Sequence, residues 1–215
     1  MKATFFVVAE QIERPEGPEL LRAIVDDGHV IQAHCGTHSS HHGQSREQLE
    51  TDARRILDVL AQNGVPAPLL WRPPYGQLSK GFSCSAAAAV GLQLVLWTHD
   101  TADWTGRSAE EMLRAAKESP FYKDSVILMH DSRRYADNKD TSQTVALIEP
   151  LVEWIRAGGF DIGPLTTRLP ARPRRAGVVL VPCAGPVVQM VRRFQRAKSA
   201  LGSLVRTSPS SRRTP

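Results

Sequence analysis

The sequence predicts an α/β fold built around a parallel sheet. Short apolar runs rich in Val, Ile, Phe and Leu alternate along the chain with segments of helical periodicity. Such repeats are typical of a parallel sheet covered on both faces, either closed into a barrel or open and doubly wound. With 215 residues, 41% of them hydrophobic, the chain can fill one core and favours a single domain.

The elements are expected in a regular order. Strands are expected at residues 3–9, 29–34, 69–73, 92–98, 125–130 and 160–165. Helices are expected at residues 18–28, 45–64, 79–90, 108–119 and 142–159. The second helix is the best marked, because Ser45 and Gln48 form a capping box and Gly64 ends it.

Targeting and redox signals are weak in this sequence. The first apolar run, ATFFVVA, is shorter than the roughly 15–30 residues of a signal peptide, so we interpret it as a buried strand. No apolar run approaches the roughly 18 residues that a membrane-spanning helix needs. The odd, widely spaced set Cys35, Cys84 and Cys183 argues against a disulfide framework. The compartment is therefore left undefined.

The net charge of +5 is unevenly distributed. Residues 171–215 carry ten Lys and Arg and no acid, whereas residues 1–170 carry 17 basic and 22 acidic residues. From Val187 to Leu201, apolar residues at helical spacing alternate with arginines. This pattern predicts a basic amphipathic helix that packs on the barrel or lies on an anionic membrane, with no strong case for nucleic acid.

Polar residues gather where four successive strands are expected to end. His34 and His38 follow the second strand, and Arg72 begins RPPYG after the third. The fourth strand is followed by HDTADW (99–104), and the fifth ends in HD (130–131). In parallel α/β folds this rim is where loops converge and active sites form. The sequence therefore predicts one constellation of His, Arg and Asp.

The spacing of the histidines indicates a metal site. His34 and His38 are four residues apart, so on one helical turn both rings face the same way and can share a cation. His38 and His42 have the same spacing and form a rival pair, while Cys35 would point away from both rings. Position favours His34, which ends its strand at the rim. His41 and His42 are expected to be exposed, and His29, at the opposite strand end, is expected to be structural.

These segments resemble a known family. GHVIQAHCGTHSSHHGQSREQL (28–49) resembles the second motif of the polysaccharide deacetylases, the carbohydrate esterase family 4 of metal-dependent N- and O-deacetylases, with Cys35 in place of the usual Ser or Thr. RPPYG, DTADW and ILMHD resemble the third, fourth and fifth motifs, and TVALIEPLVEWIRAGGFDIGPL resembles the closing helix and strand. The resemblance covers about residues 3–169 and is specific because four motifs occur in order.

The resemblance implies a role for each matching residue. His34 and His38 would bind a divalent metal, Zn in the first place, with Co, Ni or Mn as alternatives. His130 would protonate the leaving nitrogen. Asp103, or alternatively Asp100, would orient the imidazole of His130. The remaining roles are oxyanion stabilisation by the backbone amide of Tyr75, contact with the acetyl group by Trp104, Leu128 and Pro74, and a grip on the carboxylate base by Arg72.

The family's first motif has no counterpart at the rim. That motif ends a strand in Asp-Asp-Gly and supplies the base and the third metal ligand, whereas Asp26-Asp27-Gly28 here ends a helix at the opposite rim. The resemblance therefore implies a distorted (β/α) barrel that begins about one strand–helix unit late, with a degraded relative as the alternative. We expect an incomplete catalytic domain at 1–169, a basic extension at 170–215 whose end is disordered, and weak metal binding.

The expected function follows from this resemblance. The chain is expected to be a metal-dependent hydrolase of non-peptide C–N bonds that removes acetyl groups from N-acetylated or O-acetylated polysaccharide, such as peptidoglycan or a chitin-like glycan. The alternative is a catalytically inactive glycan-binding relative, because the Asp motif is missing. The family is usually extracytoplasmic or located in the cell envelope, although this sequence shows no signal peptide.

Overall fold

The computed structural model describes residues 1–79, 81–122, 124–132 and 140–165, which belong to one compact unit, Met1–Val181. The basic extension expected at 170–215 lies outside the described residues. The strands are β1 (Thr4–Val8), β2 (Val30–Cys35), β3 (Leu70–Trp71), β4 (Gln93–Leu94), β5 (His99–Asp100) and β6 (Ile127–Leu128). The helices are α1 (Ala9–Ile12), α2 (Gly17–Asp26), α3 (Arg46–Gln62), α4 (Phe82–Ala89), α5 (Ala109–Lys117) and α6 (Ser142–Ala157), with 3-10 turns η1 (Pro74–Gly76) and η2 (Asp103–Thr105).

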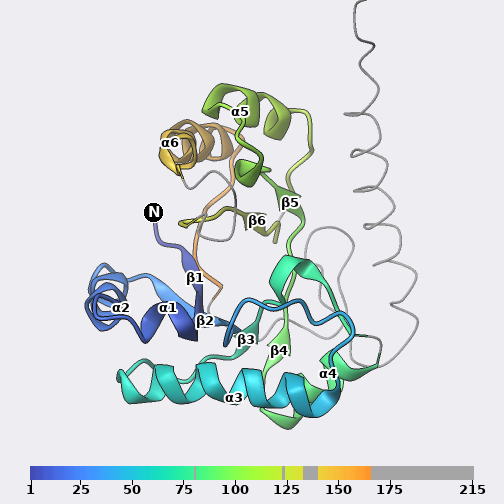
Figure 1. Ribbon diagram of the computed structural model, residues 1–215. Coiled ribbons are helices and arrows are strands. Elements are labelled where there is room, and N and C mark those ends of the chain that lie inside the picture. Colours follow the sequence, from blue (N-terminus) through green and yellow to red (C-terminus); the bar gives the residue numbers. More distant parts are fainter. Residues whose placement is uncertain (80, 123, 133–139, 166–215) are drawn as a thin grey trace, which may run out of the picture. The chain divides into compact units, whose positions relative to one another are not determined.

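All strand pairs in the described residues are parallel, which confirms the predicted fold class. One sheet has the order β1-β2-β3-β4, and a second sheet pairs β5 with β6 (Figure 1). Ala33 of β2 pairs with Trp71 of β3, and His99 of β5 pairs with Ile127 of β6. Because neighbouring strands run the same way, their carboxyl ends lie on a common side of each sheet.

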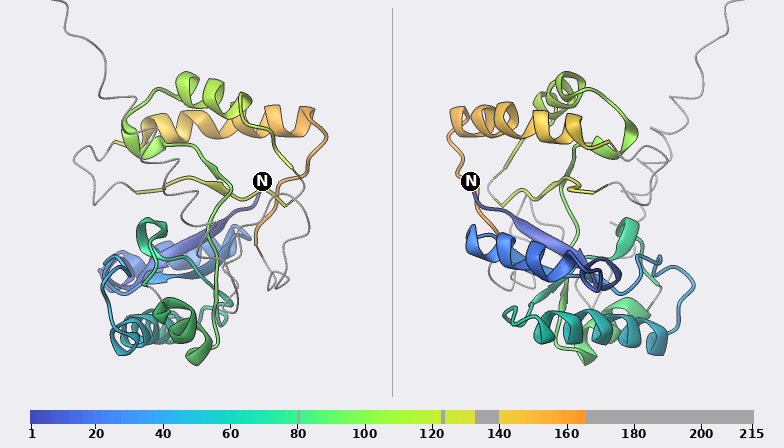
Figure 2. Two further views of the ribbon diagram at one scale, coloured as in Figure 1. Left: turned by 90° about the vertical axis from the view of Figure 1, so that its right-hand side faces the viewer. Right: turned by 60° about the vertical axis from the view of Figure 1, so that its left-hand side comes forward.

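Clusters of buried apolar side chains support these sheets. Helix α3 buries one face against the larger sheet (Figure 2), and its Ser45–Gln48 capping box forms as predicted. The buried residues of that face are Leu49, Ala53, Ile56, Val59 and Leu60. Helices α5 and α6 pack side by side (Figure 2) around a second cluster. Its buried members are Met112, Leu147, Leu151 and Ile155.

Two expected strands differ in the structure. Residues 160–165 do not form a strand, because Pro164 has no amide hydrogen to offer to a ladder, and Leu165 donates instead to the Thr4 hydroxyl at 2.7 Å. The run expected at 92–98 divides between the two sheets. β4 ends at Leu94, after which Thr98 and His99 both donate to the Val126 carbonyl.

None of the helices in the described ranges is long and apolar enough to cross a bilayer.

The Asp-Asp-Gly sequence lies at the end of a helix, as predicted. Helix α2 ends at Asp26, and Asp27 is its C-cap. Gly28 follows with φ +73°, a left-handed conformation that glycine adopts without strain. Because Val30 then begins β2, these carboxylates precede the strand whose other end carries His34. They therefore belong to the opposite rim from the predicted site.

Candidate active site

His34 lies near the carboxyl end of β2 and is held by the backbone of the next strand. Its Nδ1 lies 2.5 Å from the Arg72 carbonyl oxygen. Since a carbonyl can only accept, Nδ1 carries the proton and Nε2 presents a lone pair. Burial, followed by the nearby His38, lowers the pKa of His34 to about 3. This imidazole is therefore neutral and in the tautomer that binds a metal through Nε2.

His38 lies beside His34, but the two are not on a helical turn as the spacing suggested. The chain leaves β2 at Cys35, and His38 has φ 58° in the following loop, a left-handed value that few non-glycine residues adopt. The two rings still meet, with centroids 4.9 Å apart and planes at 75°. Burial, followed by the charge of His130, lowers the pKa of His38. The structure therefore places the two rings side by side, whereas the helical turn suggested by their spacing is absent; their role as metal ligands stays a prediction.

The other histidines are excluded from the pair by their surroundings. His41 was expected to be exposed but is 1% exposed, because its ring packs on Trp71 at 4.7 Å and its Nδ1 lies 3.3 Å from the Ser83 hydroxyl. His42 is exposed, as expected. His29 accepts a hydrogen bond from the Ala3 amide and packs edge-on against Phe5, which fits its predicted structural role.

The RPPYG segment forms the turn η1 beside His38. Tyr75 has φ 57° and places its half-exposed ring edge-on at 4.8 Å from the His38 ring. The hydrogen bonds of this turn run from the Gly76 and Gln77 amides to the Pro73 and Pro74 carbonyls, so the turn itself does not use the Tyr75 amide. A Cβ at Gly76 would lie 2.7 Å from the ring of Trp97, so only glycine allows this close approach.

Arg72 is a buried cation without a counterion among the described residues. Its side chain is 8% exposed, with the guanidinium carbon 4.0 Å above the centre of the Phe6 ring. One Nη donates at 3.5 Å to the Leu96 carbonyl, whereas Nε has no partner in the described part of the chain. Burial lowers the pKa of Arg72 to about 10. An unpaired guanidinium in this environment is a ready partner for a carboxylate.

His130 and Asp103 form a closed pair. His130 Nδ1 lies 2.8 Å from Asp103 Oδ1, and the His130 amide donates to Oδ2 at 2.7 Å. The Thr144 hydroxyl donates to the same Oδ2 at 3.1 Å. Burial opposes the charge on Asp103, but the hydrogen bonds and charge of His130, together with Thr144, outweigh it and lower the pKa of the carboxyl. Asp100 accepts from the Ala102 amide instead, so Asp103 is the carboxylate on His130.

The charge of His130 links the two groups of histidines. It is among the causes that lower the pKa of both His34 and His38, after burial in each case. The predicted acetyl-contacting residues differ in exposure. Trp104 is 50% exposed, whereas Leu128 is 7% exposed and Pro74 is buried.

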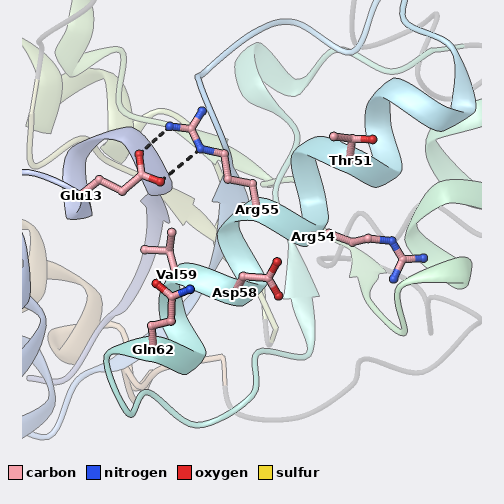
Figure 3. A pocket seen from close by; sticks show the side chains of 7 residues that line it. All are labelled: Glu13, Thr51, Arg54, Arg55, Asp58, Val59 and Gln62. Atoms are coloured by element: carbon pink, nitrogen blue, oxygen red, sulfur yellow. Dashed lines mark hydrogen bonds and ion pairs between the residues drawn. The ribbon is translucent and has the colours of Figure 1, made fainter.

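A metal would have few protein ligands here. Among the described residues no group of three His, Cys, Asp or Glu side chains is arranged to hold a metal ion. The neutral His34–His38 pair still fits as two nitrogen ligands, because the lone pair on His34 Nε2 is available. Figure 3 shows a separate open hollow between α1 and α3 that contains none of these histidines.

Sequence reasoning missed residues that surround the pair. Burial of His41 against Trp71 gave no sequence signal, because the HSSHH segment is polar throughout. Asp52 of α3 was also missed, although it accepts from the Gly36 amide at 2.9 Å. Its position directly between apolar residues of the buried face, next to Ala53, was a signal that could have found it.

Comparisons with known proteins agree with the motifs. A family model described as polysaccharide deacetylase matches residues 1–95. A peptidoglycan-N-acetylglucosamine deacetylase of Bacillus cereus is 31% identical over 163 residues, covering 74% of this chain and 71% of that protein. A chitooligosaccharide deacetylase of Bradyrhizobium is 28% identical and covers 76% of each. A family 4 carbohydrate esterase from Streptomyces lividans, solved with acetate, has a TM-score of 0.63 and 28% identity over 74% of this chain and 76% of that one.

Proposed function

The chain belongs to the polysaccharide deacetylase family, and we propose on this premise that it is a metal-dependent hydrolase that removes acetyl groups from an acetylated polysaccharide. The proposed substrate class is N-acetylated glycan of the peptidoglycan or chitin-like type, with O-acetylated glycan as a second target. The proposed catalytic unit corresponds to residues 1–169. The basic residues at 171–215 are proposed to contact an anionic membrane surface.

The observation that supports this proposal is the combination of two kinds of imidazole. His34 and His38 are neutral and adjacent, as metal ligands must be. His130, whose charge is among the causes that lower the pKa of both, is bound to a buried carboxylate, which is the arrangement of a proton donor held in a fixed tautomer. Amide hydrolysis needs both, because water must be activated on one side of the acyl carbon and the amine must be protonated on the other.

The first half of the reaction is assigned to the pair of ligands and to the turn η1. His34 and His38 would hold a divalent cation, which when bound would supply Lewis acidity to the acetyl carbonyl and lower the pKa of water. Tyr75 directs its backbone amide toward the oxygen that becomes negative in the tetrahedral intermediate. Pro74, Leu128 and Trp104 surround the acetyl methyl group and exclude water from it.

The second half of the reaction is assigned to His130. Its Nδ1–H is directed to Asp103, so Nε2 is the atom that gives a proton to the departing nitrogen. Asp103 cannot turn away, because the His130 amide and the Thr144 hydroxyl hold its second oxygen. Asp103 therefore fixes the ring of His130 in one orientation and one tautomer while the amine leaves.

A second candidate function rests on the Arg72 environment. Arg72 is proposed to hold a carboxylate that takes the proton of the attacking water, but none of the described residues provides it. If no carboxylate reaches Arg72, the same surface would bind a glycan without turnover. In that case the exposed rings of Tyr75 and Trp104 would be the contacts to sugar.

Acetate release distinguishes the two candidates. The full chain is incubated with N-acetylglucosamine oligomers, peptidoglycan and acetylated xylan, with added Zn²⁺ or Co²⁺ and with a chelator. The hydrolase predicts acetate release that the chelator abolishes and that His34→Ala eliminates, while the exposed His42→Ala remains active. Full activity of His34→Ala contradicts the proposal. Oligomer binding without acetate release supports the glycan-binding candidate.

A further inference from the structure

We infer that Asp52 of α3 is a positioning residue for the two imidazoles, because its carboxylate fixes the loop between His34 and His38. This inference rests on the proposed function in one respect, since it assigns these imidazoles to a metal. Asp52 does not touch the rings. It acts through the backbone of Gly36 and Thr37, the residues that set how the chain turns from β2 to His38.

The contact between Asp52 and the loop is close and specific. Asp52 Oδ2 accepts from the Gly36 amide at 2.9 Å, and the Gly36 and Thr37 amides both act to lower the pKa of this carboxyl against the effect of burial. A Cβ at Gly36 would lie 2.5 Å from Asp52 Oδ1 and 3.2 Å from its Cγ. The absence of a side chain at position 36 therefore lets the carboxylate reach the peptide, and any other residue there would displace it.

The same peptide is held from other directions as well. The Gly36 carbonyl accepts from the Glu10 amide of α1 at 3.0 Å. The His38 amide donates to Cys35 Sγ at 3.1 Å, and Cys35 is fully buried. The loop is thus fixed by α1, by α3 and by the end of β2. Only Asp52 contributes a charged acceptor, and hydrogen bonds to charged groups are the stronger ones.

The neighbouring arginine acts on Asp52 through its charge, because its hydrogen bonds go to Glu13. Arg55, one turn further along α3, reaches Glu13 of α1 through two hydrogen bonds (Figure 3). Among the described residues no ion pair involves Asp52. Burial raises the pKa of Asp52 and outweighs the opposing effect of the Gly36 and Thr37 amides. Helix α3 therefore holds a desolvated carboxylate against the loop.

The left-handed backbone of His38 explains why the loop needs such support. At φ 58° a histidine is in a sparsely populated conformation, of a kind that persists only where surrounding contacts determine it. If the Gly36 peptide turns, His38 can relax to a common conformation, and its ring moves away from His34. The expected result is loss of the paired geometry without unfolding of the sheet.

The test compares two identical chemical changes on one helix. Asp52→Asn is measured against Asp58→Asn, because Asp58 is exposed on α3. Binding of Zn²⁺ and Co²⁺ to the full chain is titrated by calorimetry, and thermal melts of the metal-free proteins are recorded. We expect Asp52→Asn to weaken metal binding about 10–100-fold, as loss of an outer hydrogen bond to a metal site does, and Asp58→Asn to leave it unchanged.

A second variant keeps the carboxylate and removes the contact. Gly36→Ala displaces Asp52 without altering charge, so it should weaken metal binding to a similar extent. The double variant should bind no more weakly than either single one, because both act on the same contact. Additive losses, or wild-type affinity in Asp52→Asn with only a lowered melting temperature, would overturn the inference. If Asp52→Asn does not fold, the metal affinity of Gly36→Ala alone tests the positioning role of Asp52.

A metal-free measurement separates this inference from the proposed function. If the wild-type chain binds neither metal, the proposed function fails in its metal assignment. The positioning role is then judged from the ring resonances of His34 and His38 in the metal-free protein. They should shift in Asp52→Asn and Gly36→Ala but not in Asp58→Asn. Unchanged resonances in the first two variants refute the role of Asp52.

Discussion

The two halves of the site differ in how far the chain satisfies its own polar groups. In the half formed by Asp103, His130 and Thr144, the buried carboxylate receives three hydrogen bonds from the protein. In the half around Arg72 and His34, a buried guanidinium has an unpartnered Nε within the described residues, and an imidazole presents a lone pair. The Asp103–His130 half has all its hydrogen-bond partners within the protein. The Arg72–His34 half has open positions for ligands.

This difference separates groups that move protons from groups that bind ions. A proton donor must be held in one tautomer before the substrate arrives, so its partners come from the protein. A metal ligand must keep its lone pair free, so its partner comes from outside. Unpaired polar groups in a folded protein therefore indicate where ligands bind, and paired ones indicate where geometry is already fixed.

The largest expected effect is on turnover. His130→Ala should lower kcat by about 10²–10⁴-fold, the contribution typical of a positioned proton donor, without weakening metal binding. Acetate release and metal titration are measured on the same preparation, with the exposed His42→Ala as the control. Parallel loss of metal and activity in His130→Ala would show that the two halves are not separate.

The next effect is on stability and is expected in only one of the two halves. Asp103→Leu should destabilise the fold by about 3 kcal/mol, because it leaves the His130 amide and the Thr144 hydroxyl without their acceptor. Arg72→Met should leave the stability within about 1 kcal/mol of wild type or increase it, because it removes an unpaired buried charge. Denaturant unfolding of both variants checks this. Equal destabilisation would mean that Arg72 is already paired.

A smaller effect is expected at Thr144. Thr144→Val keeps the volume and removes one hydrogen bond to a charged group, which should lower the free energy of unfolding by about 1.5 kcal/mol. Val145→Thr is the matched control, since position 145 is 64% exposed on the same helix, and its stability should stay at the wild-type value. If the unfolding midpoint of Thr144→Val equals that of the wild type, the hydrogen bond from Thr144 to Asp103 does not stabilise the fold.

The last expected effect is a pH dependence from His41. Burial lowers the pKa of His41 from 6.5 to about 4. Between pH 6.5 and 4, His41 is protonated in the unfolded chain but neutral in the folded one. The free energy of unfolding therefore falls by up to about 1.4 kcal/mol per pH unit as the pH drops from 6.5 toward 4. His41→Leu should reduce this slope without abolishing it, because His34 contributes with the same sign. Unfolding curves recorded at pH 4–7 measure it, and an unchanged slope in His41→Leu would contradict the assignment.

Much of the fold was predictable because its signals are local. The α3 capping box and apolar face, the end of α2 at Asp26 and the parallel order all follow from short patterns in the sequence. The exceptions depend on contacts distant in sequence. The run at 92–98 divides because its later amides find Val126, and Leu165 reaches Thr4 across the unit instead of extending a strand.

The site was predictable in its residues more than in its conformation. His34, His38, Asp103 and His130 were chosen from strand ends and motif spacing, and the structure places His34 beside His38 and Asp103 against His130; their roles stay predictions. Spacing alone suggested a helical turn at His34–His38, since it cannot reveal the contacts that force His38 into a left-handed conformation. Nor could it show that the polar HSSHH segment buries one ring against Trp71.

The left-handed backbone of Tyr75 has a consequence for laboratory evolution of this protein. Glycine adopts φ 57° without strain, so a screen for heat resistance alone would favour glycine at this position. The ring that faces His38 would then disappear from the selected population. Selection for thermostable variants should therefore also measure turnover in every round. Otherwise it will favour an unstrained turn at position 75 and lose the aromatic ring beside His38.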